Sequence, residues 1–173
     1  LLTGEPGRRV SGLARIATDH ELPSVRVIED GDIRTVIEAV AAVTSPDTLR
    51  WAALAHDVGK GHSEPHAREG AQLIDESNLP SMVDEPELLS FLVEHHLLLA
   101  DFATKYDIDD PGVISWVADR CRERGWLAAL YLLTIADSLA TGEDTWNEWR
   151  SELVRRAYRR VERELRSRSL PEE

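Results

Sequence analysis

The sequence predicts an all-α fold, and three observations carry this prediction. Apolar residues recur at intervals of three and four along most of the chain, which is the spacing of a helix face. Capping residues, prolines and glycines stand where successive helices would begin and end. Only residues 24–28 alternate like a strand, and one short strand cannot form a sheet. With 173 residues, 42% of them hydrophobic, the chain suits one globular domain.

Two helices are predicted before residue 60. The first has an apolar face formed by Ile33, Val36, Ile37, Val40 and Val43. Ser45 and Pro46 then provide an N-cap and a first-turn proline for the second helix. Gly59 marks where that second helix has ended.

The middle of the chain predicts two more helices. A third helix is expected from near Ser63 to Asn78. A fourth is expected from about Asp84 to Leu98. Its inner side would be formed by Leu88, Leu89, Leu92 and Val93.

Three helices are predicted in the last third of the chain. One begins at Asp110 and Pro111, and the next begins near Gly125. The helix after Gly125 is apolar nearly all round, which predicts a central position. The last helix starts at about Thr145 and has one apolar face, formed by Trp146, Trp149, Leu153, Val154, Val161 and Leu165. Trp146, Trp149 and Tyr158 are expected to pack in the core against the preceding helix.

The charge pattern narrows the range of partners. The formal net charge is −12, so a nucleic acid is not expected as a partner, because phosphate binding needs a basic surface. Residues 150–168 carry eight arginines and three glutamates, which makes this stretch +5 and the remainder −17. A basic terminal helix on an acidic body fits pairing within the chain or with a neighbouring domain. The alternative is that these arginines only form a solvent-exposed face of the last helix.

The composition also bears on the compartment. A single cysteine, Cys121, excludes an internal disulfide, and we interpret it as a structural or incidental thiol. No apolar run approaches the roughly 20 residues of a membrane span, and the first residues do not resemble a signal peptide. We therefore expect a cytoplasmic protein without a membrane partner. Because the chain begins at Leu1 instead of Met, we expect it to be a piece of a longer protein.

The placement of the histidines and of two aspartates indicates where a reactive or metal-binding site could lie. Five of the six histidines lie between residues 56 and 96. Among them, His56-Asp57 stands at a predicted helix end and His95-His96 stands in a predicted apolar helix. Asp137 interrupts a run of leucines, where an uncompensated charge would be costly. Imidazole and carboxylate groups together bind divalent Zn, Mn or Fe, so coordination of a metal ion would compensate the charge of Asp137. A hydrogen bond to a neighbouring helix end or an arginine partner would also do so.

These residues resemble the HD-domain superfamily of metal-dependent phosphohydrolases, whose His-Asp signature is similar to the segment WAALAHDVGKG. Two longer segments, VEHHLLLADFATKYDIDDPGVI and YLLTIADSLATGEDTWNEWRSELV, are similar to the HD domains of bifunctional PII uridylyltransferase/uridylyl-removing enzymes. The resemblance implies an HD-domain helical bundle over residues 30–168. Residues 1–29 would be a partly helical lead-in or linker, and residues 169–173 a disordered tail.

The resemblance also implies a metal site. Its ligands would be His56, Asp57, His66, His95, His96 and Asp137, with Asp57 bridging two ions and His95 ranked above His96. Mn²⁺ or Mg²⁺ is favoured, and Zn²⁺ and Fe²⁺ are compatible with the same ligands. Asp57 and Lys60 would be the catalytic residues, with Lys60 contacting a substrate phosphate; a solvated lysine is the equal alternative.

The implied reaction is hydrolysis of a phosphodiester, specifically the uridylyl-tyrosine of the PII signalling protein in nitrogen regulation. Metal-assisted attack by water needs no side-chain nucleophile. The sequence accordingly lacks a Gly-x-Ser-x-Gly elbow, a P-loop and a Gly-rich dinucleotide motif. In the full enzymes of this family the HD domain lies between a nucleotidyltransferase domain and ACT domains, which would be its partners together with uridylylated PII.

The sequence departs from the family at one ligand. Gly31 stands where the family has its first metal-binding histidine, and glycine has no side chain to donate. Asp30 or Asp32 could supply an oxygen instead, whereas His20 is expected on the surface and His62 in a loop. A second hypothesis follows: a degenerate HD module with a regulatory or domain-interaction role and weak or no metal binding. The other ligands favour the enzyme, because desolvated ligands cost stability without metal.

Overall fold

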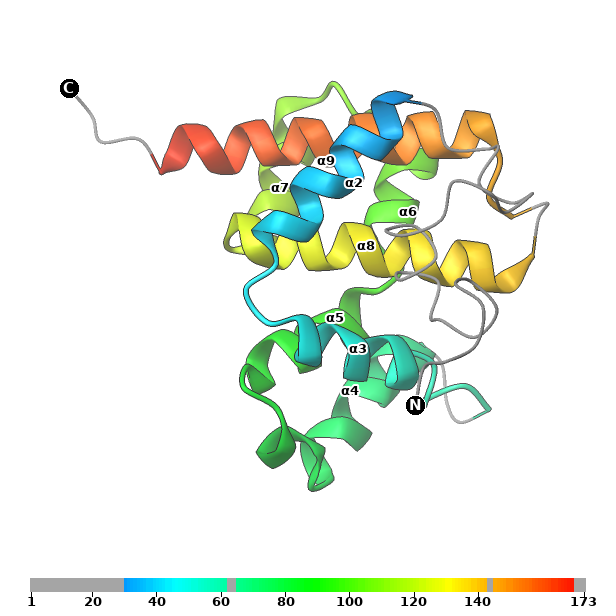
Figure 1. Cartoon of the computed structure of the whole chain (residues 1–173), viewed down its shortest axis with the longest axis vertical. Coiled ribbons are helices and arrows are strands. Elements are labelled where there is room, and N and C mark those ends of the chain that lie inside the picture. Colours follow the sequence, from blue (N-terminus) through cyan, green and yellow to red (C-terminus); the bar gives the residue numbers. More distant parts are fainter. Residues whose placement is uncertain (1–29, 62–64, 143–144, 170–173) are drawn as a thin grey trace, which may run out of the picture.

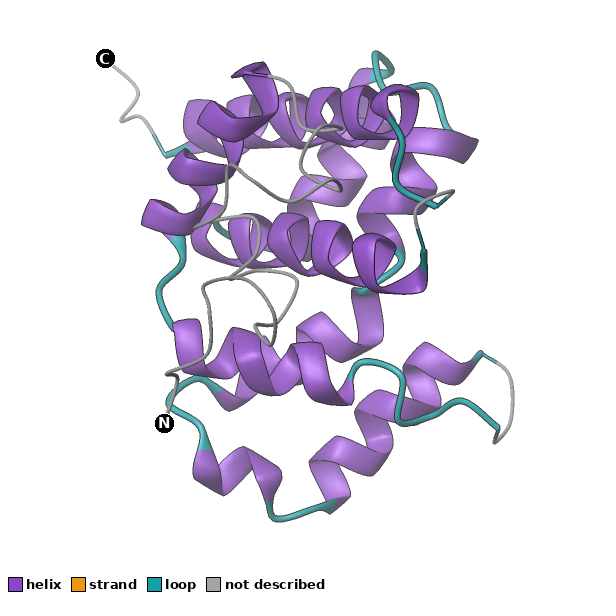
Figure 2. Ribbon diagram, turned by 45° about the vertical axis from the view of Figure 1, so that its right-hand side comes forward, coloured by secondary structure: helices purple, strands orange, loops and turns teal. Residues whose placement is uncertain are grey.

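The computed structural model describes residues 30–61, 65–142 and 145–169. Within these ranges every regular element is a helix, which confirms the all-α prediction (Figure 2). Several predictions fall outside them: the lead-in of residues 1–29 with its strand-like stretch, His20, His62 and residues 170–173 of the tail.

The bundle is organised around α8 (Arg124–Thr141), whose residues are buried almost all round, as its apolar sequence predicts. Its neighbours are α2 (Asp30–Ala42), α3 (Pro46–Ala55), α5 (Pro86–His95), α6 (Leu98–Lys105), α7 (Pro111–Cys121) and α9 (Glu148–Arg168). Figure 1 shows α8 across the middle, with α2 and α9 on one side and α3 on the other. The helix α4 (His66–Glu76) and the short 3₁₀ helix η2 (Leu79–Met82) pack on α5.

The predicted helix starts are confirmed at two caps. The Ser45 hydroxyl accepts from the Thr48 backbone N–H at 3.3 Å, and Pro46 is the first residue of α3. The Asp110 carboxylate accepts from the backbone N–H groups of Gly112 and Val113 at the start of α7. The last helix begins later than expected, because the Asn147 side chain caps α9 by accepting from Arg150.

The predicted inner face of α2 is partly wrong. Val36 is buried, but Ile37 and Val40 are 63% and 48% exposed. The helix is turned so that Asp32 and Thr35 face the bundle, because both have partners on α9. Two buried polar contacts therefore determine which face of α2 points into the bundle, and that face differs from the one the apolar residues predict.

Two predictions in other helices also need correction. The expected helix of residues 84–98 ends at His95, and after a turn the chain forms α6, which the sequence did not predict. Trp149, expected in the core, is 66% exposed because it lies in the first turn of α9. Trp146 and Tyr158 are buried as predicted, and the Tyr158 ring stacks on Tyr131 of α8 with centroids 4.4 Å apart.

The basic helix α9 is paired with carboxylates of the same chain, which confirms the prediction of pairing within the chain. Its arginines form ion pairs with four carboxylates on three other segments: Arg155 with Asp32, Arg159 with Glu38, Arg160 with Asp109 and Arg168 with Asp119. These pairs attach α9 to α2, to α7 and to the loop before α7.

Cys121 is fully buried at the end of α7, and burial raises the pKa of its thiol to about 12. It is a structural thiol, as expected. Among the described helices, none combines the length and the apolar character that crossing a membrane requires.

Glu162 of α9 is a nearly buried carboxylate that three arginines share. Its side chain is 9% exposed and contacts Arg159 at 2.9 Å, Arg124 of α8 at 3.1 Å and Arg166 at 3.4 Å. Burial by itself would raise the pKa of Glu162, but hydrogen bonds from Arg159 and Arg124 and their charges hold it below its ordinary value. The ionised carboxylate therefore stabilises the fold above the ordinary glutamate pKa, and this stabilisation is lost as the pH falls through the folded-state pKa.

We predict that Glu162→Gln lowers the free energy of unfolding by about 2–3 kcal/mol at neutral pH, because three arginines lose their common partner. The difference should shrink in acid, where the wild-type carboxylate is also protonated. Glu152→Gln is the matched control, since Glu152 lies on the same helix and is 46% exposed; we expect a change below about 0.5 kcal/mol. Urea denaturation at neutral and acid pH measures both variants. Equal effects of the two variants would contradict this account of Glu162.

Candidate metal centre

Two histidines of the site occupy equivalent positions at helix ends. His56 is the C-cap of α3, and His96 is the C-cap of α5. Each ring places Nδ1 on the carbonyl oxygen three residues earlier, at 3.1 Å from Ala53 for His56 and 2.8 Å from Val93 for His96. Because a carbonyl can only accept, Nδ1 carries the proton and Nε2 keeps its lone pair. This is the tautomer and the ring anchoring that metal-binding histidines use.

A third histidine is brought in by a close backbone approach. His66 is the first residue of α4, and the turn after α3 lies directly against that helix start. A Cβ atom on Gly59 would lie 2.1 Å from the His66 carbonyl oxygen and 2.6 Å from the Gly70 nitrogen. Only glycine therefore allows the turn that carries His56 and Asp57 to sit against α4.

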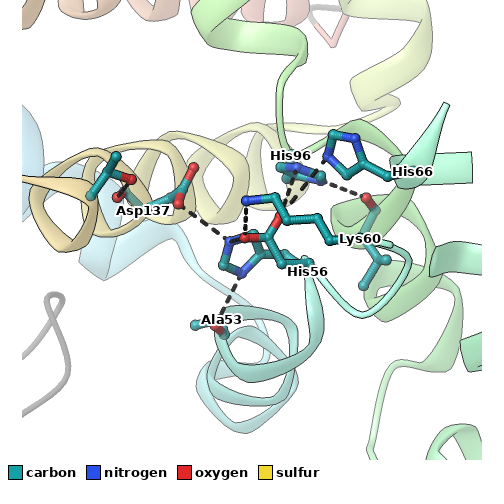
Figure 3. Close-up of polar contacts among 9 residues, drawn as sticks. Ala53, His56, Lys60, His66, His96 and Asp137 are labelled. Carbon is teal, nitrogen blue, oxygen red and sulfur yellow. Dashed lines mark hydrogen bonds and ion pairs between the residues drawn. The ribbon is translucent and has the colours of Figure 1, made fainter. Parts of the chain in front are cut away.

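The Asp57 carboxylate lies between these histidines and is one-third exposed. Its Oδ1 atom is 3.9 Å from Nε2 of His66 and 3.8 Å from Nε2 of His96. Its Oδ2 atom is 3.3 Å from Nε2 of His56 and 2.6 Å from Nζ of Lys60. Figure 3 shows His56 and Lys60, from the turn after α3, converging with His66 and His96 from two other segments. Each oxygen of one carboxylate thus faces a different group of side chains.

Asp137 completes the arrangement from α8. Its Oδ1 atom lies 3.3 Å from Nε2 of His56 (Figure 3). The contact with Asp137 raises the pKa of His56 against the opposing effect of burial, and the same contact lowers the pKa of Asp137. Burial lowers the pKa of His96, so that ring favours its neutral form. Asp137, whose charge in the apolar central helix would be costly without a partner, therefore has the His56 imidazole as its neighbour.

These residues form two groups with ligand atoms close enough to share an ion. One group is Asp57, His66 and His96, and the other is His56, Asp57 and Asp137; within each group the atoms lie within 4.8 Å of one another. The Nε2 atoms of His56 and His66 are buried and make no hydrogen bond of ordinary geometry. Buried imidazole nitrogens without a hydrogen-bond partner, beside carboxylate oxygens, fit a divalent cation.

Not every residue expected at the site lies there. The His95 ring instead packs against Phe91, with centroids 5.1 Å apart, and lies 3.9 Å from the Glu94 carboxylate. It belongs to neither ligand group. His96, ranked below it from the sequence, is the member of the doublet that faces Asp57.

The structure also bears on the replacement for the missing family histidine. Gly31 lies within α2. Asp32 is not free to donate an oxygen to a metal, because it is buried against α9, where it contacts Ser151 and pairs with Arg155 at 3.0 Å. The side chain of Asp30 lies outside the described residues.

Lys60 is held beside the site by charge. Its side chain is 62% exposed, and the hydrogen bond from Nζ to Asp57 raises its pKa. The ammonium is therefore present at neutral pH, next to the carboxylate and open to solvent.

Comparison with known proteins places the chain in a family that binds metal. Residues 8–142 match the family described as HD domain. The chain belongs to the HD-domain family. HD domains bind divalent metals, and the two ligand groups contain the donors for such ions. No solved structure matches the chain significantly.

The curated relatives are much longer proteins, and a short part of each is similar to this chain. A bifunctional uridylyltransferase/uridylyl-removing enzyme of Azotobacter vinelandii is 36% identical over 131 residues, which are 73% of this chain and 14% of the relative. Proteins of the same name from Cereibacter sphaeroides and Streptomyces coelicolor are 36% identical over 156 residues and 37% identical over 145. These matches cover 87% and 81% of this chain, and 16% and 17% of the relatives. This HD domain therefore spans about a sixth of their length.

We predict that Gly59→Ala separates the His56-Asp57 turn from α4, because the added Cβ would overlap two backbone atoms. The free energy of unfolding should fall by about 1–3 kcal/mol, and divalent metal affinity should fall with it. Gly112→Ala is the control, since a Cβ there meets only the Asp110 side chain; we expect a change below about 1 kcal/mol. Chemical denaturation and calorimetric metal titration measure both properties. A Gly59 variant with unchanged stability and affinity would refute the close approach.

We predict that the two adjacent histidines differ in metal binding. His96→Gln should weaken Mn²⁺ binding by about tenfold or more, because Nε2 faces Asp57. His95→Gln should weaken it by less than about threefold, because that ring faces Phe91. Calorimetric titration with Mn²⁺ checks both, after thermal melting has shown that each variant folds. A larger loss in the His95 variant would show that the ligand group is assigned wrongly.

Proposed function

We propose that the domain is a metal-dependent phosphohydrolase of the HD type that cleaves phosphodiesters, with the uridylyl-tyrosine of PII protein as its substrate. The observation that carries this proposal is the Asp57 carboxylate, which lies between two separate groups of nitrogen and oxygen donors. The printed names of the relatives, which include a uridylyl-removing activity, support the choice of substrate.

His56, Asp57 and Asp137 would hold one ion, and Asp57, His66 and His96 would hold a second. Mn²⁺ or Mg²⁺ is favoured, and Zn²⁺ and Fe²⁺ are compatible with the same donors. Divalent ions in such sites lower the pKa of bound water and polarise phosphoryl oxygens.

The side chains of this domain would position the reaction. The bonds from Nδ1 of His56 and His96 to backbone carbonyls hold both rings fixed, so little reorganisation is needed. Lys60 presents an ammonium next to Asp57 and open to solvent, where it would bind a phosphoryl oxygen of the substrate. Cys121 is buried at the far end of α7 and takes no part as a nucleophile.

We further propose that the domain works beside other domains in a longer enzyme. A nucleotidyltransferase domain and ACT domains would be those neighbours, and uridylylated PII would be the macromolecular substrate. The support is the length of the relatives, of which this chain matches 14–17% in the three comparisons above.

One observation favours a second candidate, a regulatory HD module with weak or no metal binding. Gly31 stands in α2 at the position of the first family ligand, and the neighbouring Asp32 is committed to α9. This candidate requires that the purified domain neither retains a divalent ion nor turns over any phosphodiester.

We predict that the domain hydrolyses bis(p-nitrophenyl) phosphate and uridylylated PII in the presence of Mn²⁺. Asp57→Asn should lower kcat by about 100-fold or more, because both ligand groups lose their common carboxylate. Asp109→Asn is the matched control, since Asp109 is half-exposed and pairs with Arg160 on α9; its activity should equal that of the wild type. Release of p-nitrophenol and of UMP measures the two reactions.

The outcomes separate the two candidates. Turnover of the model diester without release of UMP from PII would retain the hydrolase and reject the substrate. No bound metal and no turnover in any divalent ion would favour the regulatory module. Full activity of the Asp57 variant would reject the proposed site.

A further inference from the structure

A second cluster of charged residues lies between α2 and α9, away from the candidate metal centre. A cavity of about 550 Å³ is lined there by Arg34, Glu38, Arg159, Glu162, Arg163 and Arg166. Figure 1 shows α2 crossing α9 on the side of α8 opposite to α3. Every lining residue is an arginine or a glutamate, so only side-chain methylene groups supply apolar surface, and the polar groups are guanidinium and carboxylate groups.

The two carboxylates of this cavity are already neutralised by arginines. Glu38 pairs with Arg159 at 2.6 Å. Glu162 is shared by Arg159, Arg166 and, from α8, Arg124. These contacts hold Arg159 between two carboxylates and a hydroxyl, that of Thr35 at 3.1 Å.

Two arginines remain without a carboxylate. Arg34 and Arg163 are exposed, and neither has an ion pair or hydrogen bond with any residue of the described ranges. Four arginines and two glutamates give the cavity a net charge of +2, in a chain whose formal net charge is −12. A positive cavity in a strongly acidic protein attracts small anions locally while the rest of the surface repels them.

The cavity is separate from the candidate metal centre. Arg124, which contacts Glu162, begins α8, and Asp137 lies in its last turns. At about 1.5 Å per residue, the 13 positions between them correspond to about 20 Å along the helix. A molecule in this cavity would therefore not touch Asp57.

We propose that this cavity is a binding site for a compact polyanion, held by Arg34 and Arg163 with Arg166 alongside. Guanidinium groups remain charged at all physiological pH values and bind phosphate or carboxylate oxygens through paired N–H donors. The volume exceeds what one phosphate fills, and the charged lining favours a ligand that carries anionic oxygens on all sides. A pyrophosphate group or a tricarboxylate has this chemistry. The site lies outside the proposed hydrolase function and does not depend on it.

Calorimetric titration of the metal-free chain in EDTA tests the proposal, with inorganic pyrophosphate and citrate as the two probes. We expect saturable binding of at least one probe with one site per chain, and the tighter probe identifies phosphate or carboxylate as the natural chemistry. The double variant Arg34→Gln/Arg163→Gln should weaken binding by about tenfold or more, because both unpaired guanidinium groups are lost.

Arg156→Gln/Arg160→Gln is the matched control. It removes the same amount of charge, here from α9 alone, at residues that pair with Asp109, and should weaken binding by less than about twofold. Because Arg34 and Arg163 are exposed, their variants should melt like the wild type. Absence of saturable binding for both probes, or an equal loss in the control variant, would overturn the proposal. Neither result bears on hydrolysis at Asp57.

Discussion

The arrangement of this domain depends on one partly buried negative charge, the carboxylate of Asp57. Its two oxygens face opposite groups, with His66 and His96 on one side and His56 and Lys60 on the other. A carboxylate in this position is costly without compensation, and three separate segments supply partners for it: the end of α3, the start of α4 and the end of α5. Asp137 of the central helix α8, itself a carboxylate, contacts His56. The packing of these segments is therefore also the assembly of the site.

The fold class was predictable because it follows from local rules, whereas the candidate ligands were predicted from the resemblance to the HD-domain family. Helix caps at Ser45 and Asp110 act through neighbouring backbone groups, and the end of a helix at His56 follows from residues next to it. The choice between His95 and His96 was not predictable in this way. Adjacent helical residues point about 100° apart, so a shift of one residue in where α5 ends exchanges the two rings. The equivalent position of His56 at its own helix end was the available signal.

The face of α2 shows a different limit of sequence reasoning. Its apolar stripe predicted burial of Ile37 and Val40, yet both are exposed because Asp32 and Thr35 bind α9, more than 100 positions along the chain. Periodicity contains no information on such distant polar partners. The arginines of α9 pair with carboxylates on α2 and α7, while the apolar side of the helix packs in the core.

The most direct test of the central claim is a crystal structure of the domain grown with Mn²⁺, with the ions located by anomalous scattering. The account predicts density at coordination distance from the Asp57 carboxylate, with His56 and Asp137 on one side and His66 and His96 on the other. Manganese found only elsewhere, with no ion beside the Asp57 carboxylate, would contradict it.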